Sequence, residues 1–179
     1  MVGLRLAQIY MDPETMSRYD RACKLLHWSE SGLVRQAIAA YFKVHLDYYV
    51  ECSYRDLEAR EMAVEDWYTT LRDKSIEELP RYKRGRPAFG ATPLDTISPV
   101  DTGFKNKRRY GTIALGGFNF VLLRVAQLVD LGPQTQLISR IVKYHFDQYW
   151  ETNYLPQIEF DEQTTLPRRN HAGLDNRRR

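Results

Sequence analysis

The chain has no uninterrupted apolar run near the roughly 20 residues that cross a bilayer. Its first residues also lack the basic-then-apolar pattern of a signal peptide. The two cysteines, Cys23 and Cys52, are too few for a disulfide framework. From these absences we expect a protein of the reducing cytoplasm that has no membrane partner.

Catalytic and metal-binding motifs are also missing. We find no nucleophile elbow, phosphate-binding loop, zinc-protease helix or paired carboxylates. Cys23 and His27 are four residues apart, but His45 and Cys52 are too distant in sequence to complete a clustered zinc site. Cys23 also falls on an apolar stripe, which favours a core position. We therefore expect no enzyme, no metal site and no cofactor.

Charge is unevenly distributed, although the formal net charge of the 179 residues is only +3. Residues 47–80 carry four basic and ten acidic groups, whereas residues 81–110 carry eight basic and two acidic groups. The tail from residue 163 carries five basic groups and one acidic group. Basic segments that alternate with acidic ones are typical of cationic arms on a folded body. Ordinary solvated linkers are the alternative.

Residues 4–43 have the pattern of a strand followed by two helices. Leu4–Met11 alternates in period two, with Ala7, Ile9 and Met11 on the apolar side. Asp12-Pro13 predicts the start of a helix, because a capping carboxylate precedes a proline at the first helical position. Ser29 predicts the cap of a second helix, after a break at His27-Trp28.

The same pattern returns 104 residues later without a gap: Ile113 falls on Ile9, Leu137 on Leu33 and Phe146 on Phe42. Because strand, helices and turn align at one offset, an internal duplication is the favoured interpretation. We expect a unit at 1–46, an acidic helical segment at 47–79, a basic Pro/Gly-rich linker at 80–110, a second unit at 111–150 and a basic tail at 151–179. The expected fold class is mainly α with two short β-strands.

The two segments between the units and the tail have distinct characters. Residues 47–79 contain no glycine or proline and predict one long helix or two shorter ones. Residues 80–110 contain four prolines and three glycines and predict a loop or an extended arm. After Trp150 the periodicity is lost, which predicts a disordered tail. The first helix of the second unit is apolar nearly all round, so residues 47–79 or a second chain are expected to cover it.

Residues 4–43 resemble the ribbon–helix–helix family of DNA-binding proteins. The resemblance is most specific over Ser29-Glu30-Ser31-Gly32-Leu33-Val34-Arg35-Gln36-Ala37-Ile38, which is similar to the family's turn and second helix. Residues 110–149 match more loosely, because Pro133-Gln134-Thr135 and Gly116-Gly117 replace the capping residues of the first unit. The resemblance implies tandem ribbon–helix–helix units that form a pseudo-dimer.

In such a unit the strand cannot stay unpaired, and a two-stranded ribbon fits the major groove of DNA. We expect Leu6 at the edge and Gln8 and Tyr10 outward in the first strand, with Thr112 and Ala114 outward in the second. Gln8 suits an adenine edge. The linker of 64 residues from Asp47 to Tyr110 permits pairing within one chain, so we expect a mixed ribbon that reads an asymmetric site. A small hairpin with solvent-facing polar residues is the alternative.

Other residues are candidates for phosphate contacts. Ser29, Ser31 and Thr135 lie where the second helices begin, and free amides at a helix N-terminus bind phosphate. Lys83-Arg84-Gly85-Arg86-Pro87 resembles an AT-hook, a short element that binds the minor groove. A generic phosphate-binding arm or a plain linker remain alternatives for it. The remaining basic candidates are Lys105, Lys107, Arg108 and Arg109.

The expected function is sequence-specific binding of double-stranded DNA, as a transcriptional regulator associated with the nucleoid. An architectural, partition or relaxosome-accessory DNA-binding protein is one alternative. An antitoxin-like module, in which residues 47–79 dock on a partner protein, is another. The sequence leaves open whether whole chains form a homodimer or a higher oligomer.

Overall fold

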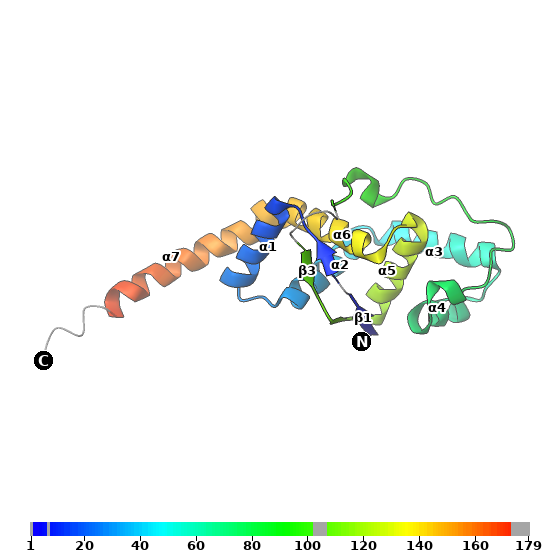
Figure 1. Cartoon of the computed structure of the whole chain (residues 1–179), viewed down its shortest axis with the longest axis horizontal. Helices are drawn as coiled ribbons and strands as arrows, with labels where there is room; N and C mark the ends of the chain where they lie inside the picture. The colour runs from blue at the N-terminus through cyan, green and yellow to red at the C-terminus, as the bar shows by residue number, and fades with distance from the viewer. Residues whose placement is uncertain (1, 7, 102–106, 173–179) are drawn as a thin grey trace, which may run out of the picture.

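The computed structural model describes residues 2–6, 8–101 and 107–172, with side chains described as far as Thr164. The fold is mainly helical, with short strands in two small sheets. Figure 1 shows an elongated body from which the last helix projects at one end. Among the described residues, no helix is both long enough and apolar enough to cross a membrane.

The strands of the two units pair with each other. β1 (Val2–Arg5) pairs antiparallel with β4 (Thr112–Leu115), and β2 (Gln8–Tyr10) pairs antiparallel with β3 (Lys107–Arg109). In both sheets the residue numbers of two paired residues add to 117, as for Arg5 with Thr112 and Gln8 with Arg109. Between the sheets, the amide of Leu6 donates to the carbonyl of Gly111 at 3.0 Å, in the same register. The four strands therefore form one antiparallel ribbon in a single register, and the predicted pairing within the chain is confirmed.

The helices repeat at the offset that the sequence predicts. The first unit contributes α1 (Pro13–Leu25) and α2 (Glu30–Val44). The second contributes α5 (Gly117–Asp130) and α6 (Gln134–Tyr149), which begin 117 − 13 = 104 and 134 − 30 = 104 residues later. The turns repeat as well, because His27 and Leu131, also 104 apart, have φ angles of 55° and 52°.

The predicted caps of the first unit are confirmed. Asp12 accepts a hydrogen bond from the amide of Thr15 at 2.9 Å, and Ser29 accepts one from the amide of Gly32 at 3.1 Å. In the second unit, Gly116 and Pro133 occupy the two cap positions, and neither provides a side-chain cap. The second unit thus keeps the helix boundaries of the first without its capping chemistry.

Residues 47–79 form two shorter helices, which is one of the two arrangements that the sequence predicts. α3 (Leu46–Arg60) and α4 (Val64–Asp73) are followed by a 3-10 turn, η1 (Ile76–Glu78). α3 and α4 both pack against α5. Residues 47–79 therefore cover α5, the helix that is apolar nearly all round. This is one of the two covers that the sequence predicts, the other being a second chain.

A buried polar network joins α3, α4 and the following loop. Asp56, which is fully buried, pairs with Arg60 at 2.8 Å and accepts a hydrogen bond from the indole nitrogen of Trp67 at 2.8 Å. The hydroxyl of Tyr82 donates to the same carboxylate at 2.5 Å, and the Arg60 guanidinium lies 3.9 Å from the centre of the Tyr82 ring. Asp56 is therefore the shared acceptor of a buried network, and it is not one of the solvent-exposed acids of this segment.

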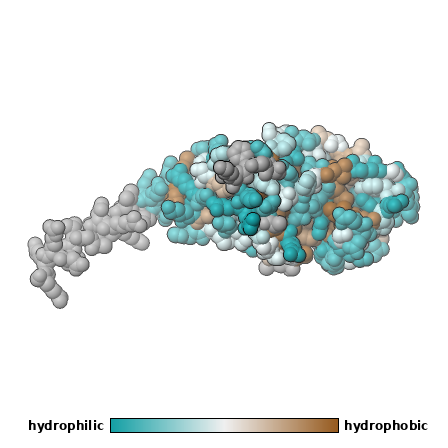
Figure 2. Space-filling model, in the orientation of Figure 1, coloured by the Kyte–Doolittle hydropathy of each residue, from teal (hydrophilic) through white to brown (hydrophobic). Residues whose placement is uncertain are grey.

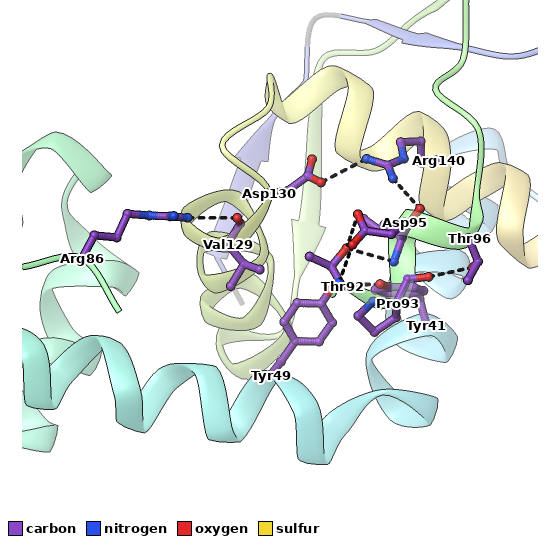
Figure 3. A network of polar contacts seen from close by, with 11 residues as sticks. Tyr41, Tyr49, Arg86, Thr92, Pro93, Asp95, Thr96, Val129, Asp130 and Arg140 are labelled. Atoms are coloured by element: carbon purple, nitrogen blue, oxygen red, sulfur yellow. Dashed lines mark hydrogen bonds and ion pairs between the residues drawn. The ribbon is translucent and has the colours of Figure 1, made fainter. Parts of the chain in front are cut away.

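The loop after η1 does not behave as the extended arm that its composition predicts. It includes a second 3-10 turn, η2 (Pro93–Thr96), and buries Phe89, Leu94, Ile97 and Val100. The guanidinium of Arg140 contacts the carboxylate of Asp130 at 3.0 Å and the carbonyl of Leu94 (Figure 3). Of the two forms that the sequence predicts, a loop is what residues 80–101 adopt and an extended arm is not, because apolar side chains and backbone carbonyls fix this segment to the helices.

The expectation of a disordered tail is also wrong for most of its length. α6 continues through a π-helical turn, η3 (Trp150–Tyr154), into α7 (Leu155–Ala172). Trp150, Tyr154 and Ile158 are buried, whereas the residues from Glu159 to Thr164 are exposed. The described side chains beyond Ile158 are thus exposed as the helix projects from the body (Figure 1), and Glu162 pairs there with Arg21 of α1 at 4.0 Å. Residues 173–179 lie outside the described part of the chain.

Hydrophobic residues also reach the surface at the other end of the body. In Figure 2 they gather away from α7, while most of the visible face is hydrophilic. Tyr54, Val64 and Phe118, which are about half exposed, line a small groove among α3, α4 and α5. The groove has a volume of about 150 Å³.

Candidate nucleic-acid interface

The ribbon turns one face to the helices and one to solvent, but the alternation changes phase halfway along. Leu4 and Leu6 are buried in the first half, and Ile9 and Met11 are buried in the second. Gly3, Arg5, Gln8 and Tyr10 therefore point outward. The position expected for Leu6 is corrected, because this side chain is 1% exposed and belongs to the core. Ala7, which was expected in the core, lies outside the described residues.

The second strand changes phase at the same place. Ile113 and Leu115 are buried, Thr112 is exposed and Ala114 is half-buried, as the sequence predicts. In β3, Lys107 and Arg109 are exposed. The outward face of the ribbon thus consists of four cross-strand pairs: Gly3–Ala114, Arg5–Thr112, Gln8–Arg109 and Tyr10–Lys107.

This face is cationic. It carries Arg5, Lys107 and Arg109 and no acidic residue. Among the described residues, the side chains of these three cations have no ion pair or hydrogen bond partner. Many other basic side chains of the body are engaged, as Lys83 and Arg84 are with Glu61. Cations without a described ion pair on the solvent-facing side of the ribbon favour a polyanionic partner.

Polar contacts hold the half of the ribbon that carries Gln8. The amide nitrogen of the Gln8 side chain donates to the hydroxyl of Tyr10, and both residues are half-buried. The backbone amide of Tyr10 donates to the hydroxyl of Ser139 on α6 at 2.8 Å. Ser139 is buried and donates in turn to the carbonyl of Thr135 at 2.6 Å. The hydrogen bond to Ser139 therefore holds the backbone of β2 against α6, and the hydroxyl of Tyr10 orients the side-chain amide of Gln8.

Arg108 lies on the other side of the ribbon, although the sequence groups it with Lys107 and Arg109. It is the cross-strand partner of the buried Ile9, and its guanidinium contacts the carboxylate of Asp20 on α1. Burial opposes the charge of Arg108, but the hydrogen bond and charge of Asp20 outweigh it and raise the pKa of the guanidinium. This arginine joins the ribbon to α1 instead of facing outward.

The two second helices present different N-termini. At α2, Ser29 and Ser31 are exposed, and Arg35 is exposed one turn further on. An open groove of about 660 Å³ lies here, and Gly116 and Asn119 of α5 also line it. The hydroxyl of Ser29 already caps the helix, so Ser31 is the freer of the two predicted phosphate ligands.

At α6 the chain covers its own helix terminus. Pro133 has no amide hydrogen to offer, and Thr135 is only half exposed. The side chain of Gln134 donates to the carbonyl of Arg5 at 3.4 Å, and that of Gln136 donates to the carbonyl of Val100. The predicted phosphate contact at Thr135 therefore has less open surface than its counterpart at Ser31.

The AT-hook-like segment is folded back on the body, far from an extended form. The backbone amide of Lys83 donates to the carbonyl of Ala59 at 2.9 Å, and Gly85 has a φ of 81°. Arg86 donates to the carbonyls of Leu128 and Val129 at 2.9 and 3.1 Å, at the end of α5. Figure 3 shows the contact with Val129. Its guanidinium also lies 5.1 Å from the centre of the Phe89 ring. In this arrangement Arg86 caps a helix, while Lys83 and Arg84 remain largely exposed beside Glu61.

Lys105, the last of the predicted phosphate ligands, lies outside the described residues. Within the described ranges, no group of three or more His, Cys, Asp or Glu side chains is placed to hold a metal ion. Searches against protein-family models, curated proteins and solved structures found no match for this chain.

The structure adds one outward residue that the sequence analysis missed and reassigns two others. Arg5 was not among the candidates, because unbroken alternation from Leu4 to Met11 centres the outward face on Gln8 and Tyr10. Lys107 and Arg109 were grouped with a basic arm, whereas β3 places them on the ribbon opposite Tyr10 and Gln8. The signal available in the sequence was the charged run at residues 107–109. The strand that pairs with the first strand must also present outward side chains, and this run can supply them.

Proposed function

We propose that this protein binds double-stranded DNA sequence-specifically and acts as a transcriptional regulator. The observation that carries the proposal is the outward face of the ribbon, which presents polar side chains, no acid, and three cations that have no ion pair within the described part of the chain. A two-stranded ribbon has the width of the major groove, and phosphates on both sides of the groove attract its cations.

The fold class implied by this proposal is a pair of ribbon–helix–helix units on one polypeptide, related as a pseudo-dimer. In its favour are the strand–helix–helix order of each unit, the common offset of 104 residues in the helix starts and the pairing of the two strands. The resemblance of residues 29–38 to the family's second helix supports the same assignment. In this arrangement the exposed N-terminus of α2, with Ser31 and Arg35, lies ready to contact a phosphate beside the groove.

The antitoxin-like alternative is less well supported. It requires residues 47–79 to offer an apolar face to a partner protein, and this segment exposes only the small groove beside Tyr54 and Val64. Trp67 and Leu71 of α4 are buried against the same chain, and α3 and α4 both pack on α5. An architectural or relaxosome-accessory DNA-binding protein would use the same interface. These roles differ from transcriptional regulation in which DNA is bound and which process the binding affects.

The proposal is tested by measuring the affinity of the full chain for duplex DNA as salt is raised. Each phosphate that a protein cation neutralises contributes about −0.9 to the slope of log affinity against log salt. Substituting Arg5, Lys107 and Arg109 by alanine together should weaken binding and flatten the slope by up to about 2.7. An affinity for duplex DNA that does not change with salt, or no binding at low salt, would refute DNA as the partner.

A matched control removes the same number of charges elsewhere. Lys24, Lys74 and Arg81 are exposed cations on α1, after α4 and after η1, and none has a described ion pair. Replacing these three by alanine should change affinity and slope much less than the ribbon triple variant. If both triple variants weaken binding equally, DNA is held by general charge and the ribbon is not its site.

A further inference from the structure

The two arginines of the outward face occupy equivalent central places on opposite strands. The midpoint of the ribbon is the pair formed by Leu6 and Gly111, whose backbones are joined at 3.0 Å. Arg5 lies directly on one side of this midpoint, and the Gln8–Arg109 pair lies on the other. Lys107 lies farther out, at the end of the ribbon. When a ribbon enters a groove, its centre comes nearest to the bases and its ends come nearest to the phosphates.

The centre of the ribbon is also open to close approach. Leu6 points into the core, and Gly111, which is exposed, has no side chain. A Cβ atom built on Gly111 would have no neighbour within 4 Å, so nothing in the described part of the protein covers this point. The flanking arginines can therefore extend beyond the backbone on both sides without a bulky residue between them.

The backbones that carry these residues are anchored to α6. The carbonyl of Arg5 accepts a hydrogen bond from Gln134 at 3.4 Å, and the amide of Tyr10 donates to Ser139 at 2.8 Å. Arg109 is held through its pairing with Gln8. Fixed backbones let a planar guanidinium present its donors in a constant direction, which is a requirement for reading a base edge.

Arginine and glutamine suit different bases. The guanidinium fork matches the O6 and N7 acceptors of guanine, and the glutamine amide matches the N6 donor and N7 acceptor of adenine. Arg5 and Gln8 are three residue steps apart at about 3.3 Å per residue, which gives about 10 Å along the ribbon. At about 3.4 Å per base pair this separation corresponds to about three base pairs.

We infer that Arg5 and Arg109 each read one guanine, that these guanines are about three base pairs apart, and that Gln8 reads an adenine beside the guanine of Arg109. The inference rests on the proposed function and names the DNA that the ribbon selects. Because Thr112, and not a second glutamine, stands opposite Arg5, the two halves of the site differ. The site is therefore not a palindrome, and one chain binds it in one direction.

The test begins with selection of duplexes from a random pool by the intact protein, followed by the same selection with Arg5→Ala and Arg109→Ala. Each variant should lose about tenfold or more in affinity for the wild-type site and lose the preference for guanine at one position, a different one for each variant. Arg81→Ala removes an exposed arginine away from the ribbon and should leave the selected sequence unchanged. Thermal unfolding checks that all variants remain folded.

Chemical substitution of the DNA then isolates the base contact. Replacing one guanine by 7-deazaguanine removes the N7 acceptor but keeps the phosphate. This change should weaken the wild-type protein and should have no effect on the variant that lacks the matching arginine. Arg5→Lys keeps the charge and should recover affinity for random DNA without recovering the guanine preference.

Three results would overturn the inference while leaving DNA binding intact. The first is a palindromic selected site, the second is a site without guanines at that spacing, and the third is an equal loss of selected and random binding in both arginine variants. Absence of duplex binding by the wild-type protein at low salt would instead remove the proposed function itself.

Discussion

The first helices of the two units share one place in the repeat and differ sharply in burial. α1 buries three residues, Thr15, Tyr19 and Ala22, whereas α5 buries eight. The difference follows from what packs on each helix: two further helices, α3 and α4, pack on α5, whereas α1 meets α7, where Arg21 pairs with Glu162 at 4.0 Å. The two units thus share their helix boundaries, but the residues that each helix buries depend on the elements that pack on it.

The largest effect is expected at the buried network that holds α3 and α4 over α5. Asp56→Ala leaves Arg60, which is 6% exposed, without its carboxylate and leaves the Trp67 and Tyr82 donors unsatisfied. The free energy of unfolding should fall by about 3–5 kcal/mol, measured by chemical denaturation. Asp66→Ala, at an exposed position on α4, is the control and should change it by about 0.5 kcal/mol at most. Equal effects would mean that the network does not hold this layer.

The units should also differ in their response to acid. His145 is 2% exposed, and burial lowers its pKa from 6.5 to about 4. Its counterpart 104 residues earlier is Tyr41, which does not take up a proton in this range. Because the depressed folded pKa means that the unfolded chain binds the proton first, stability is full above about pH 6.5 and falls as the pH drops towards 4.

From pH 7 to pH 5 this group alone should remove about 2 kcal/mol from the free energy of unfolding. His145→Tyr copies the residue of the first unit, and its unfolding curve should lose that part of the pH dependence. If the variant and the wild type show the same slope between pH 7 and pH 5, another group is responsible.

An effect of similar size separates the arginines of the AT-hook-like segment. Arg86 bonds two carbonyls at the end of α5, while Arg84 is 66% exposed and contacts Glu61 at 3.3 Å. Arg86→Ala should cost about 1.5–3 kcal/mol of stability, and Arg84→Ala about 0.5 kcal/mol or less. A segment that acts only as a DNA-binding arm would show the reverse: unchanged melting for both variants and weaker DNA binding for both.

The smallest effect concerns the caps of the second helices. Ser29→Ala removes the hydrogen bond to the Gly32 amide and should lower stability by about 1 kcal/mol. Pro133→Ala removes no side-chain cap and should lower stability by about 0.5 kcal/mol or less. Comparable losses at both positions, measured by thermal unfolding, would show that Pro133 contributes to α6 in a way that cap chemistry does not describe.

The sequence predicted the helices well where a local signal marks their ends. Asp12 and Ser29 cap α1 and α2 as expected, and the offset of 104 residues places α5 and α6. It failed after Trp150, where a π-helical turn follows α6 and only one side chain per turn is buried among exposed or half-buried neighbours. Trp150, Tyr154 and Ile158 are buried at spacings of four, which continue the series Ile138, Val142 and Phe146 of α6.

The candidate site was predicted in part. The outward positions of Gln8, Tyr10, Thr112 and Ala114 follow from alternation, whereas the phase change between Leu6 and Ile9 cannot be read from a single strand. The linker was predicted to be a loop or an extended arm, because prolines and glycines mark such segments in general. What holds it in place is contact between arginine side chains and backbone carbonyls, as between Arg140 and Leu94, and these leave no periodic signal.

The long separation between the paired strands also has a consequence for synthesis. β2 ends at Tyr10, and its partner β3 begins only at Lys107. At about 5–20 residues per second, a ribosome needs roughly 5–20 s to make the chain between them. During that interval the first strand is finished but unpaired, while α1 and α2 can already fold. On a crowded polysome, the strand of one nascent chain can then meet that of its neighbour before its own partner emerges, so translation speed affects how often two chains exchange strands.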